Sequence, residues 1–268
     1  MRFKEGERVF GRVAQNKMGA FAEYVAVRED YVTKMPASLD FESAAGIPLA
    51  GLTALQCLRD VLAVRPGQRI FISWGAGGVG IFAIQLAKWF GAEVATTASP
   101  EVEALVRSLD ADWVIDYTRE RINTIIHDFA GALDLVGGST LANTFGIVKP
   151  GRKVVSIAGR PDPDPITALK DPHSRIDLAV LFLFSSLPIH LLVLAHGVFY
   201  RYVFVHPGGS DLSELAGLVD RGKLKPAVDR IFPFGEIDQA FAYLEAGHAK
   251  GKVIVKMVDC TDLTPAGT

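Results

Sequence analysis

The sequence predicts an α/β fold with a parallel β-sheet, because apolar runs typical of strands alternate with helical stretches along most of the chain. Arg69–Ser73 and Val94–Thr97 are two such runs, and the helical period of Ile81–Phe90 separates them. A glycine cluster follows the first run directly. Strands that alternate with helices in this way form parallel sheets with right-handed crossovers.

The other elements are predicted from the same changes of period. Phe21–Val27 has the alternating pattern of a strand, and Asp40–Leu62 has a helical period with breaks at Pro48 and Gly51. The remaining predicted strands are Arg8–Gly11, Trp113–Ile115, Leu133–Val136, Lys153–Ile157, Tyr202–Val205, Arg230–Pro233 and Lys252–Met257, and the remaining predicted helices are Leu212–Asp220 and Ile237–Glu245.

Composition and charge narrow the class of protein. The 268 residues are 49% hydrophobic and carry a net charge of -2, which fits a globular protein and gives no general attraction to nucleic acid. Cys57 and Cys260 form no CxxC pair, so no disulfide framework is expected. The N-terminus lacks the apolar core of a secretion signal. We expect a cytoplasmic protein, and a mitochondrial location stays open.

One uncharged segment, Leu178–Tyr200, is long enough to cross a membrane. Pro188, His190 and His196 lie within it, which favours buried helices that cover the sheet or a subunit interface. We therefore expect no membrane span, and peripheral contact with a membrane stays open as an alternative.

The strongest chemical signal is the glycine cluster after the strand Arg69–Ser73. Gly75, Gly77 and Gly80 form the pattern G-x-G-x-x-G between a buried strand and an amphipathic helix. The first glycine permits a tight turn, the second lets a pyrophosphate approach the backbone, and the third lets the helix pack on the strand. The N-terminus of the helix offers free N–H groups to the phosphates. The sequence therefore predicts a Rossmann-type dinucleotide-binding domain.

Two other chemistries are excluded by the residues present. A phosphate-binding P-loop requires Lys and then Ser or Thr after its last glycine, where this chain has Ile81 and Phe82. The segment 137–141, GGSTL, lacks the last glycine of a nucleophile elbow.

The end of the second strand favours NADPH over NADH. An NAD enzyme places Asp or Glu about 20 residues after the glycine loop to bind the ribose hydroxyls. Here the strand ends in the small hydroxyl side chains of Thr97 and Ser99, which leave room for a 2′-phosphate. The alternative is that both residues only cap the next helix. Candidate neighbours of the phosphate are Arg107, Tyr117 and Arg119.

Six motifs occur in order along the chain. They are FKEGERV at 3–9, GAFAEY at 19–24, AAGIPLAGLTA at 44–54, the glycine loop at 75–80, GRKVVSI at 151–157 and GHAKGKV at 247–253. Together they resemble the quinone-oxidoreductase branch of the medium-chain dehydrogenase/reductase family. The segments 200–202 and 247–252 are most similar to the mitochondrial reticulon-interacting NADPH oxidoreductases.

The resemblance implies an NADPH site, residue by residue. The pyrophosphate would lie on the glycine loop, and the nicotinamide would lie beside a threonine and the end of a later strand. The family is usually dimeric through its last Rossmann strand, here Tyr202–Val205. The implied contacts are Ala76, Gly77, Gly78, Val79 and Gly80 for the pyrophosphate, Thr97, Ser99 and Tyr117 near the adenosine 2′-phosphate, Thr53 facing the nicotinamide, and Ile157 and Gly159 along its edge.

The resemblance also implies a domain order. Residues 1–50 would form a partial GroES-like substrate domain, 51–222 the Rossmann NADPH-binding domain, and 223–268 a return to the substrate domain. The family's substrate domain begins well before the motif at 3–9, so we expect an N-terminally truncated chain in which no catalytic residue can be assigned. The segment 130–138 is shorter than in the family, and Glu101 and Val102 stand where many members carry a lysine.

The expected function is zinc-independent hydride transfer from NADPH to a quinone or an activated C=C bond. Zinc members of the superfamily take Cys and His or Glu ligands from the front domain and a cysteine-rich lobe, whereas Cys57 is expected in a helix core and Cys260 in the tail. Two alternatives stay open: a catalytically silent NADPH-binding interaction or stress protein, and a member attached to a membrane through Leu178–Tyr200.

Overall fold

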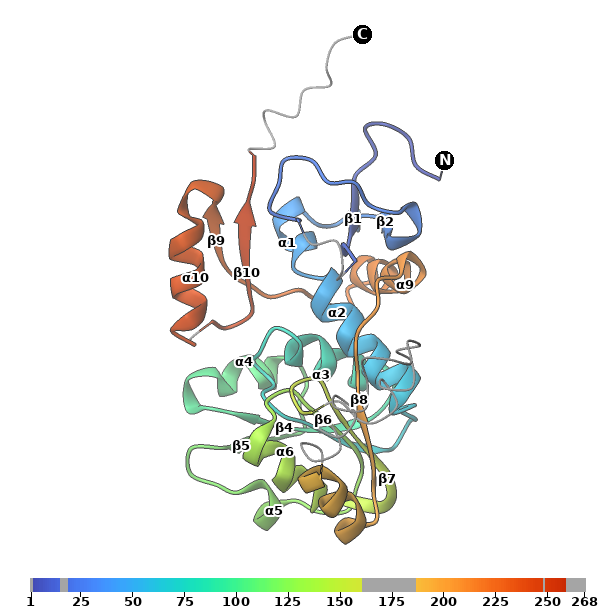
Figure 1. Cartoon of the computed structure of the whole chain (residues 1–268), viewed down its shortest axis with the longest axis vertical. Coiled ribbons are helices and arrows are strands. Elements are labelled where there is room, and N and C mark those ends of the chain that lie inside the picture. Colours follow the sequence, from blue (N-terminus) through green and yellow to red (C-terminus); the bar gives the residue numbers. More distant parts are fainter. Residues whose placement is uncertain (1, 15–18, 161–186, 248, 259–268) are drawn as a thin grey trace, which may run out of the picture. The chain divides into compact units, whose positions relative to one another are not determined.

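The chain forms two compact units in the computed structural model, which describes residues 2–14, 19–160, 187–247 and 249–258. The sheet unit comprises residues 56–75 and 86–204, and the second unit comprises 1–55, 76–85 and 205–268. Figure 1 shows the elements of both units. The chain passes from the sheet unit to the second unit between Gly75 and Ala76, inside the glycine loop.

The sheet unit is built on six parallel strands in the order β5-β4-β3-β6-β7-β8. The first strand in sequence, β3, lies in the middle, with β4 on one side and β6 on the other. This is the strand order of a Rossmann fold, so the predicted fold class is confirmed. The strands are β3 Arg69–Ile72, β4 Glu93–Ala98, β5 Trp113–Asp116, β6 Phe129–Asp134, β7 Val148–Ser156 and β8 Phe199–Tyr202.

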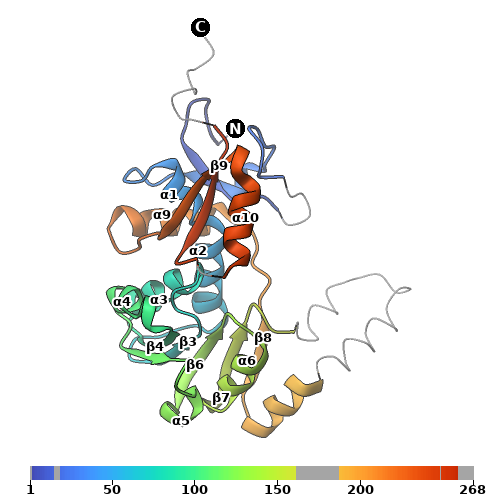
Figure 2. The ribbon, with the colours of Figure 1, turned by 90° about the vertical axis from the view of Figure 1, so that its left-hand side faces the viewer.

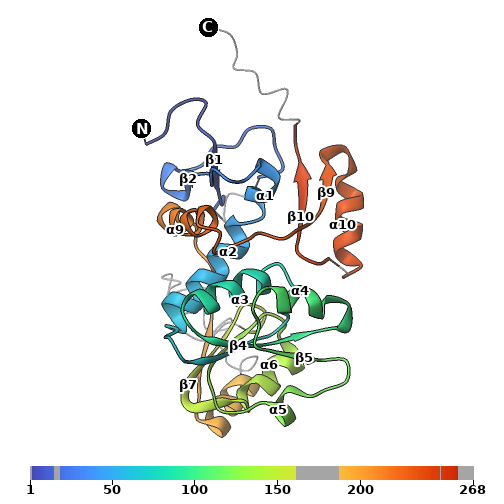
Figure 3. The same cartoon turned by 180° about the vertical axis from the view of Figure 1, so that it is seen from behind.

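Helices cover both faces of this sheet. On one face, the buried side chains of Phe71, Ala132 and Val154 pack with those of Leu141 and Phe145 from α6. Figure 2 shows α6 and α5 on this face, and Figure 3 shows α4 lying over β4 on the other. Strands covered on both faces explain the continuous apolar runs in the sequence. The helices are α4 Glu103–Ser108, α5 Ile122–Ile125, α6 Gly138–Phe145, the π-helix Gln56–Val61, the 3-10 helix Pro100–Val102 and a helix at 187–196. Helix α3 Gly80–Trp89 is shared, because its residues 80–85 belong to the second unit and 86–89 to the sheet unit.

The second unit contains two separate strand pairs. Strands β1 Val9–Gly11 and β2 Val32–Lys34 are antiparallel, and β9 Val228–Pro233 and β10 Lys252–Lys256 are parallel. Helix α10 Ile237–Glu245 connects the parallel pair and lies along it (Figure 2). The other helices of this unit are α1 Phe41–Ala45, α2 Pro48–Leu55, α9 Gly209–Asp220 and the 3-10 helices Glu29–Tyr31 and Phe234–Glu236.

Two predictions in the second unit are wrong. The segment Phe21–Val27 is not a strand, because no strand among the described residues pairs with it, and Tyr24 is 90% exposed. Gly51 does not break a helix but lies inside α2. A Cβ at Gly51 would lie 3.0 Å from the side chain of Leu215 on α9, so the glycine permits close packing of two helices.

Two predicted strands of the sheet unit begin earlier than expected. Strand β6 ends at Asp134, not Val136, and β8 covers Phe199–Tyr202, not Tyr202–Val205. The predicted apolar segment Leu178–Tyr200 therefore ends within the sheet, and its residues 178–186, like Cys260, lie outside the described residues. In the described part of the chain, no helix is both long and apolar enough to cross a membrane.

A fully buried carboxylate joins the ends of three neighbouring strands. Asp134, the last residue of β6, accepts hydrogen bonds from the hydroxyl of Ser156 on β7 at 2.7 Å and from the hydroxyl of Ser73 after β3 at 3.4 Å. The N–H of Gly137 donates to the same carboxylate at 3.0 Å. Because a buried charge is costly unless donors surround it, these groups hold one another in place. We call Ser73, Asp134 and Ser156 the carboxyl-edge network.

The network also sets the path of the loops that follow the strands. The Ser73 hydroxyl accepts from the N–H of Leu135 at 2.8 Å, and the Ser156 hydroxyl accepts from the N–H of Gly159 at 2.7 Å. Gly137 has a φ of 79°, and a Cβ there would lie 2.6 Å from the carbonyl oxygen of Ala158. The loops after β6 and β7 therefore approach each other as closely as a glycine allows.

We predict that Asp134→Asn lowers the free energy of unfolding by about 1–3 kcal/mol, because the new NH2 group must face a donor or leave one unpaired. Urea unfolding of the wild type and the variant measures this difference. Asp110→Asn makes the same chemical change at an exposed position and should change stability by less than about 0.5 kcal/mol. Equal stability of Asp134→Asn and the wild type would contradict the role of the network.

Candidate functional site

The carboxyl ends of the parallel strands carry most of the predicted site residues in the sheet unit. Thr97 and Ser99 are at the end of β4, Tyr117 follows β5, and Ile157 and Gly159 follow β7. In an open α/β sheet, ligands bind at this edge, where neighbouring strands leave the first strand on opposite sides. The sheet unit has that arrangement at β3, between β4 and β6.

The beginning of the glycine loop is held by the end of β4. Trp74 has a φ of 54°, which lies in the left-handed region and is rare for a bulky residue. The N–H of Trp74 donates to the hydroxyl oxygen of Thr97 at 2.9 Å, and the N–H of Gly75 donates to the carbonyl oxygen of Thr97 at 3.0 Å. These two hydrogen bonds fix the direction in which the loop leaves β3.

The rest of the loop leads directly into helix α3, which begins at Gly80. The N–H of Ile81 donates to the carbonyl oxygen of Gly77 at 3.1 Å, and the N–H of Ala83 donates to that of Val79 at 2.9 Å. The amides that precede these donors have no partner within the helix and can bind an anion. Ala76, Gly77 and Gly80 are buried, whereas Gly78 and Val79 are half-buried.

Hydroxyl groups at the end of β4 do not cap the next helix. The Thr97 hydroxyl accepts from Trp74, and Ser99 precedes the 3-10 helix Pro100–Val102 without a side-chain cap hydrogen bond. The structure therefore does not support the alternative that Thr97 and Ser99 serve only to cap the next helix. The end of β4 carries no carboxylate, because Glu101 comes only in the following helical turn.

The residues after β5 place charges of both signs near Tyr117, which is 56% exposed. The Thr118 hydroxyl donates to Asp116 at 2.6 Å and holds the pKa of that carboxyl below its usual range. Arg119 approaches the same carboxylate at 3.6 Å, and Arg107 pairs with Glu103 at 2.7 Å. Both arginines suggested for the 2′-phosphate thus have acidic neighbours.

The remaining predicted residues fall into different surroundings. Thr53 is buried in α2, where its hydroxyl donates to the carbonyl oxygen of Leu49 at 2.7 Å. A Cβ at Gly159 would lie 2.5 Å from the hydroxyl oxygen of Tyr200 and 2.9 Å from that of Ser156, so this position is packed on both sides. Ile157 is half-buried, and its N–H donates to the carbonyl oxygen of Asp134 at 3.2 Å.

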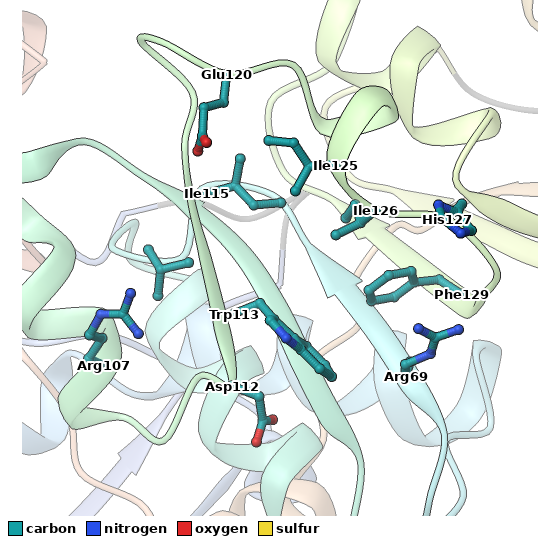
Figure 4. A pocket seen from close by; sticks show the side chains of 11 residues that line it. Arg69, Arg107, Asp112, Trp113, Ile115, Glu120, Ile125, Ile126, His127 and Phe129 are labelled. Carbon is teal, nitrogen blue, oxygen red and sulfur yellow. The ribbon is translucent and has the colours of Figure 1, made fainter.

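Pockets of the described sheet unit include two that bear on the predicted site. One of about 380 Å³ lies where β3, β5 and β6 begin, with Arg69, Trp113 and Phe129 in its wall (Figure 4). Its lining includes Arg107, which was suggested as a neighbour of the 2′-phosphate, but none of the residues that the resemblance assigns to the cofactor contacts. The other, of about 370 Å³, is lined mostly by apolar side chains of α6 and of 188–192, and it includes Gly159.

The described part of the chain shows neither a group of metal ligands nor an accessible thiol. Within residues 2–14, 19–160, 187–247 and 249–258, no three His, Cys, Asp or Glu side chains are grouped as metal ligands. Cys57 is fully buried, and burial raises the pKa of its thiol to about 12. Its predicted position in a helical core is confirmed, and such a thiol is unreactive.

Two features near the strand ends and the glycine loop were not predicted from the sequence. The carboxyl-edge network was not expected, although an acid that ends a strand just before Gly137 is a readable signal. Lys252 was not expected either: a Cβ at Gly78 would lie 2.8 Å from its Cδ and 3.4 Å from its Nζ. A lysine directly after Gly251, at the start of a strand far along the chain, carries no local sign of this contact.

Comparisons with known proteins agree with this architecture. A family model described as zinc-binding dehydrogenase matches residues 109–255. The mitochondrial NAD(P)H oxidoreductase RTN4IP1 of Danio rerio is 35% identical over 96% of this chain and 67% of its own length. The chloroplastic NADPH-dependent alkenal/one oxidoreductase of Arabidopsis thaliana is 36% identical over 94% of this chain and 58% of its own. The chain thus spans about two thirds or less of these relatives.

A solved structure supports the same relationship. The quinone oxidoreductase from Coxiella burnetii superposes with a TM-score of 0.81 and 29% identity, over 96% of this chain and 74% of that one. The sequence similarity extends beyond the sheet unit, since the alignments cover nearly all of this chain. The chain therefore belongs to the zinc-binding dehydrogenase family, in the quinone-oxidoreductase-like branch of the medium-chain dehydrogenases/reductases.

Proposed function

We propose that this chain binds NADPH and acts as an oxidoreductase toward a quinone or an activated C=C bond. The main support for this proposal is the geometry of the glycine loop. Thr97 holds its turn at Trp74 by a hydrogen bond, and its end forms the first turn of α3. The end of β4 next to it has hydroxyl groups and no carboxylate, which suits a 2′-phosphate. Relatives named as NADPH-dependent alkenal/one oxidoreductase and quinone oxidoreductase support the same reading.

The residues of this chain fit the cofactor in distinct roles. NADPH, when bound, supplies two electrons and a hydrogen as hydride to the acceptor, and a proton from solvent completes the reduction. The loop amides from Ala76 to Gly80 would bind the pyrophosphate. Thr97, Ser99 and Tyr117 would surround the adenosine end, and Thr53, Ile157 and Gly159 would contact the nicotinamide. The carboxyl-edge network would keep the loop at Ile157 in place through Ser156.

Zinc has no step in this proposal. The described residues do not fit a zinc ion, because they offer no group of three ligands. Hydride transfer to a quinone or an enone needs orientation of the two reactants more than it needs a Lewis acid. We therefore propose a zinc-independent member of a family whose name refers to zinc.

The organisation of the chain follows as part of the proposal. Residues 51–222 would form the Rossmann NADPH-binding domain, with 1–50 and 223–268 contributing to a GroES-like substrate domain. A homodimer would pair the exposed edge strand β8, in which Phe199 is 60% exposed. Because the names of two relatives include the words mitochondrial and chloroplastic, a location in an organelle is as well supported as a cytoplasmic one. Contact with a membrane surface is not needed for any of these roles.

We predict that Gly78→Val weakens NADPH binding at least tenfold, because the added side chain enters the space at the loop and displaces Lys252. Fluorescence titration with NADPH gives the two dissociation constants. Gly235→Val is the matched control: a Cβ at Gly235 meets nothing within 4 Å, so its dissociation constant should equal that of the wild type. Unchanged affinity in Gly78→Val would refute the glycine-loop assignment.

We predict that the wild type binds NADPH more tightly than NADH and that Ser99→Asp reverses this preference. A carboxylate at the end of β4 repels a 2′-phosphate and accepts hydrogen bonds from ribose hydroxyls instead. Dissociation constants for both cofactors, measured at one ionic strength, test the prediction. Tighter binding of NADH by the wild type would show that the hydroxyl groups do not select the phosphate.

We predict that NADPH is consumed when an ortho-quinone or an enone is added, and that Gly78→Val slows this reaction in proportion to its lost affinity. The loss of NADPH absorbance measures the rate, with a reaction lacking the acceptor as the control. NADPH binding without consumption by either acceptor would instead favour the catalytically silent binding protein.

A further inference from the structure

A row of side chains across the sheet ends in an exposed tryptophan. Phe71 on β3, Ala95 on β4 and Trp113 on β5 lie opposite one another on neighbouring strands. Phe71 and Ala95 are fully buried, whereas Trp113, on the edge strand β5, is 41% exposed. The helix that packs on this face, α5, is a single turn of four residues, Ile122–Ile125. Because a parallel sheet is normally covered on both faces, the short helix leaves the outer end of this row open.

The pocket of about 380 Å³ lies at this opening. The side chains that begin three strands, Arg69, Trp113 and Phe129, line it together with Ile125 and His127 at the end of α5 and beyond it. In the view of Figure 4, the indole of Trp113 has Arg69, Phe129 and His127 on one side. All five residues belong to the sheet unit. The volume lies within the range of sites that hold small molecules, about 300–1,000 Å³, so the pocket is large enough for a small ring compound.

Arg69 supplies a positive charge to this pocket, and its position is fixed. Its guanidinium donates to the carbonyl oxygen of Asp128 at 3.2 Å and lies 5.3 Å from the centre of the Phe129 ring. Asp128 has a φ of 64°, a left-handed conformation that aspartate tolerates better than most residues. The turn at Asp128 and the ring of Phe129 thus hold the guanidinium in place without neutralising its charge.

The acidic side chains in the pocket wall are already bound elsewhere. Asp112 accepts hydrogen bonds from the ammonium of Lys88 at 2.7 Å and from the N–H of Val94 at 2.7 Å. Glu120 lies on the loop after β5, where it accepts from the N–H of Asp116 at 3.2 Å. Neither carboxylate forms an ion pair with the guanidinium in the wall.

The charge that is left without a counter-ion is therefore that of Arg69. Arg107, also in the wall, pairs with Glu103 at 2.7 Å. Arg69 forms no ion pair among the described residues, and the carbonyl oxygen of Asp128 uses only part of its N–H donors. A half-buried arginine with donors to spare is suited to an anion from outside, and its planar fork fits a carboxylate.

We propose that this pocket binds a small aromatic carboxylate, with its ring against the indole of Trp113 and its carboxylate on the guanidinium of Arg69. An exposed indole attracts another ring beyond what burial alone contributes, and Ile125, which is 43% exposed, adds an apolar edge. The site is separate from the proposed cofactor site, because Arg69 begins β3 and the glycine loop follows the other end of that strand. NADPH and the carboxylate would therefore bind independently.

The test is calorimetric titration of the whole chain with 2-naphthoate and, separately, with its neutral amide, 2-naphthamide. The two probes share a ring system and differ in charge. We expect the wild type to bind naphthoate at least about tenfold more tightly than the amide, as a hydrogen bond to a charged group provides. Arg69→Met should abolish this difference. Arg121→Met removes an equal charge from an exposed position outside the pocket and should preserve it.

Further variants separate the ring contact from the charge and from folding. Trp113→Leu should weaken the binding of both probes about three- to tenfold, because it removes the aromatic contact and leaves Arg69 in place. Arg69→Lys keeps the positive charge without the planar fork and should retain a preference for naphthoate. Thermal unfolding shows whether each variant is folded. If Arg69→Met does not fold, Arg69→Gln also removes the charge and is titrated in its place.

Three results would overturn the proposal. The first is no binding of naphthoate by the wild type at about 1 mM. The second is equal affinity of the wild type for naphthoate and the amide, because the charge of Arg69 would then have no role. The third is loss of naphthoate binding when NADPH is present, because the probe would then occupy the cofactor site. The same dissociation constant for naphthoate with and without NADPH is the result that supports two separate sites.

Discussion

The interaction on which the rest of the sheet unit depends is the buried carboxylate of Asp134. Three parallel strands end at this point, and each contributes to one network through Ser73, Asp134 and Ser156. A carboxylate with 0% exposure is tolerated only while its donors stay in place. Because the buried carboxylate needs these donors, the hydrogen bonds fix the positions of the ends of β3, β6 and β7 relative to one another. The loops that leave these strands start from this fixed edge.

The glycine loop has a different support at each end. Its beginning is held by Thr97, which accepts hydrogen bonds from Trp74 and Gly75 and stabilises a backbone conformation that a tryptophan rarely adopts. Its later part has Lys252 against Gly78. A hydroxyl and a lysine that are distant in sequence thus support a segment of a few residues. Such support is what a loop needs if its amides are to meet phosphates without reorganising.

The electrostatic character of the site follows from which charges are already neutralised. Arg107 and Arg119 have acidic neighbours, and Asp116 keeps its charge because Thr118 and its own loop donate to it. The end of β4 has hydroxyl groups alone. Lys252 is the cation beside the loop that has no partner in the described part of the chain.

The sequence by itself determined the fold class, the position of β3, β4 and α3, and the glycine loop, because these depend on local periodicity and on the backbone freedom of glycine. The prediction of a strand at Phe21–Val27 was wrong, because a strand needs a partner strand. The prediction of a helix break at Gly51 was also wrong, because a glycine inside a helix can allow close packing, here with Leu215. Only the tertiary structure decided that Asp134 joins three strand ends and that Lys252 meets Gly78. Those contacts join residues separated by about 20 to more than 170 positions, and no local pattern specifies which distant side chain will satisfy a buried charge or approach a loop.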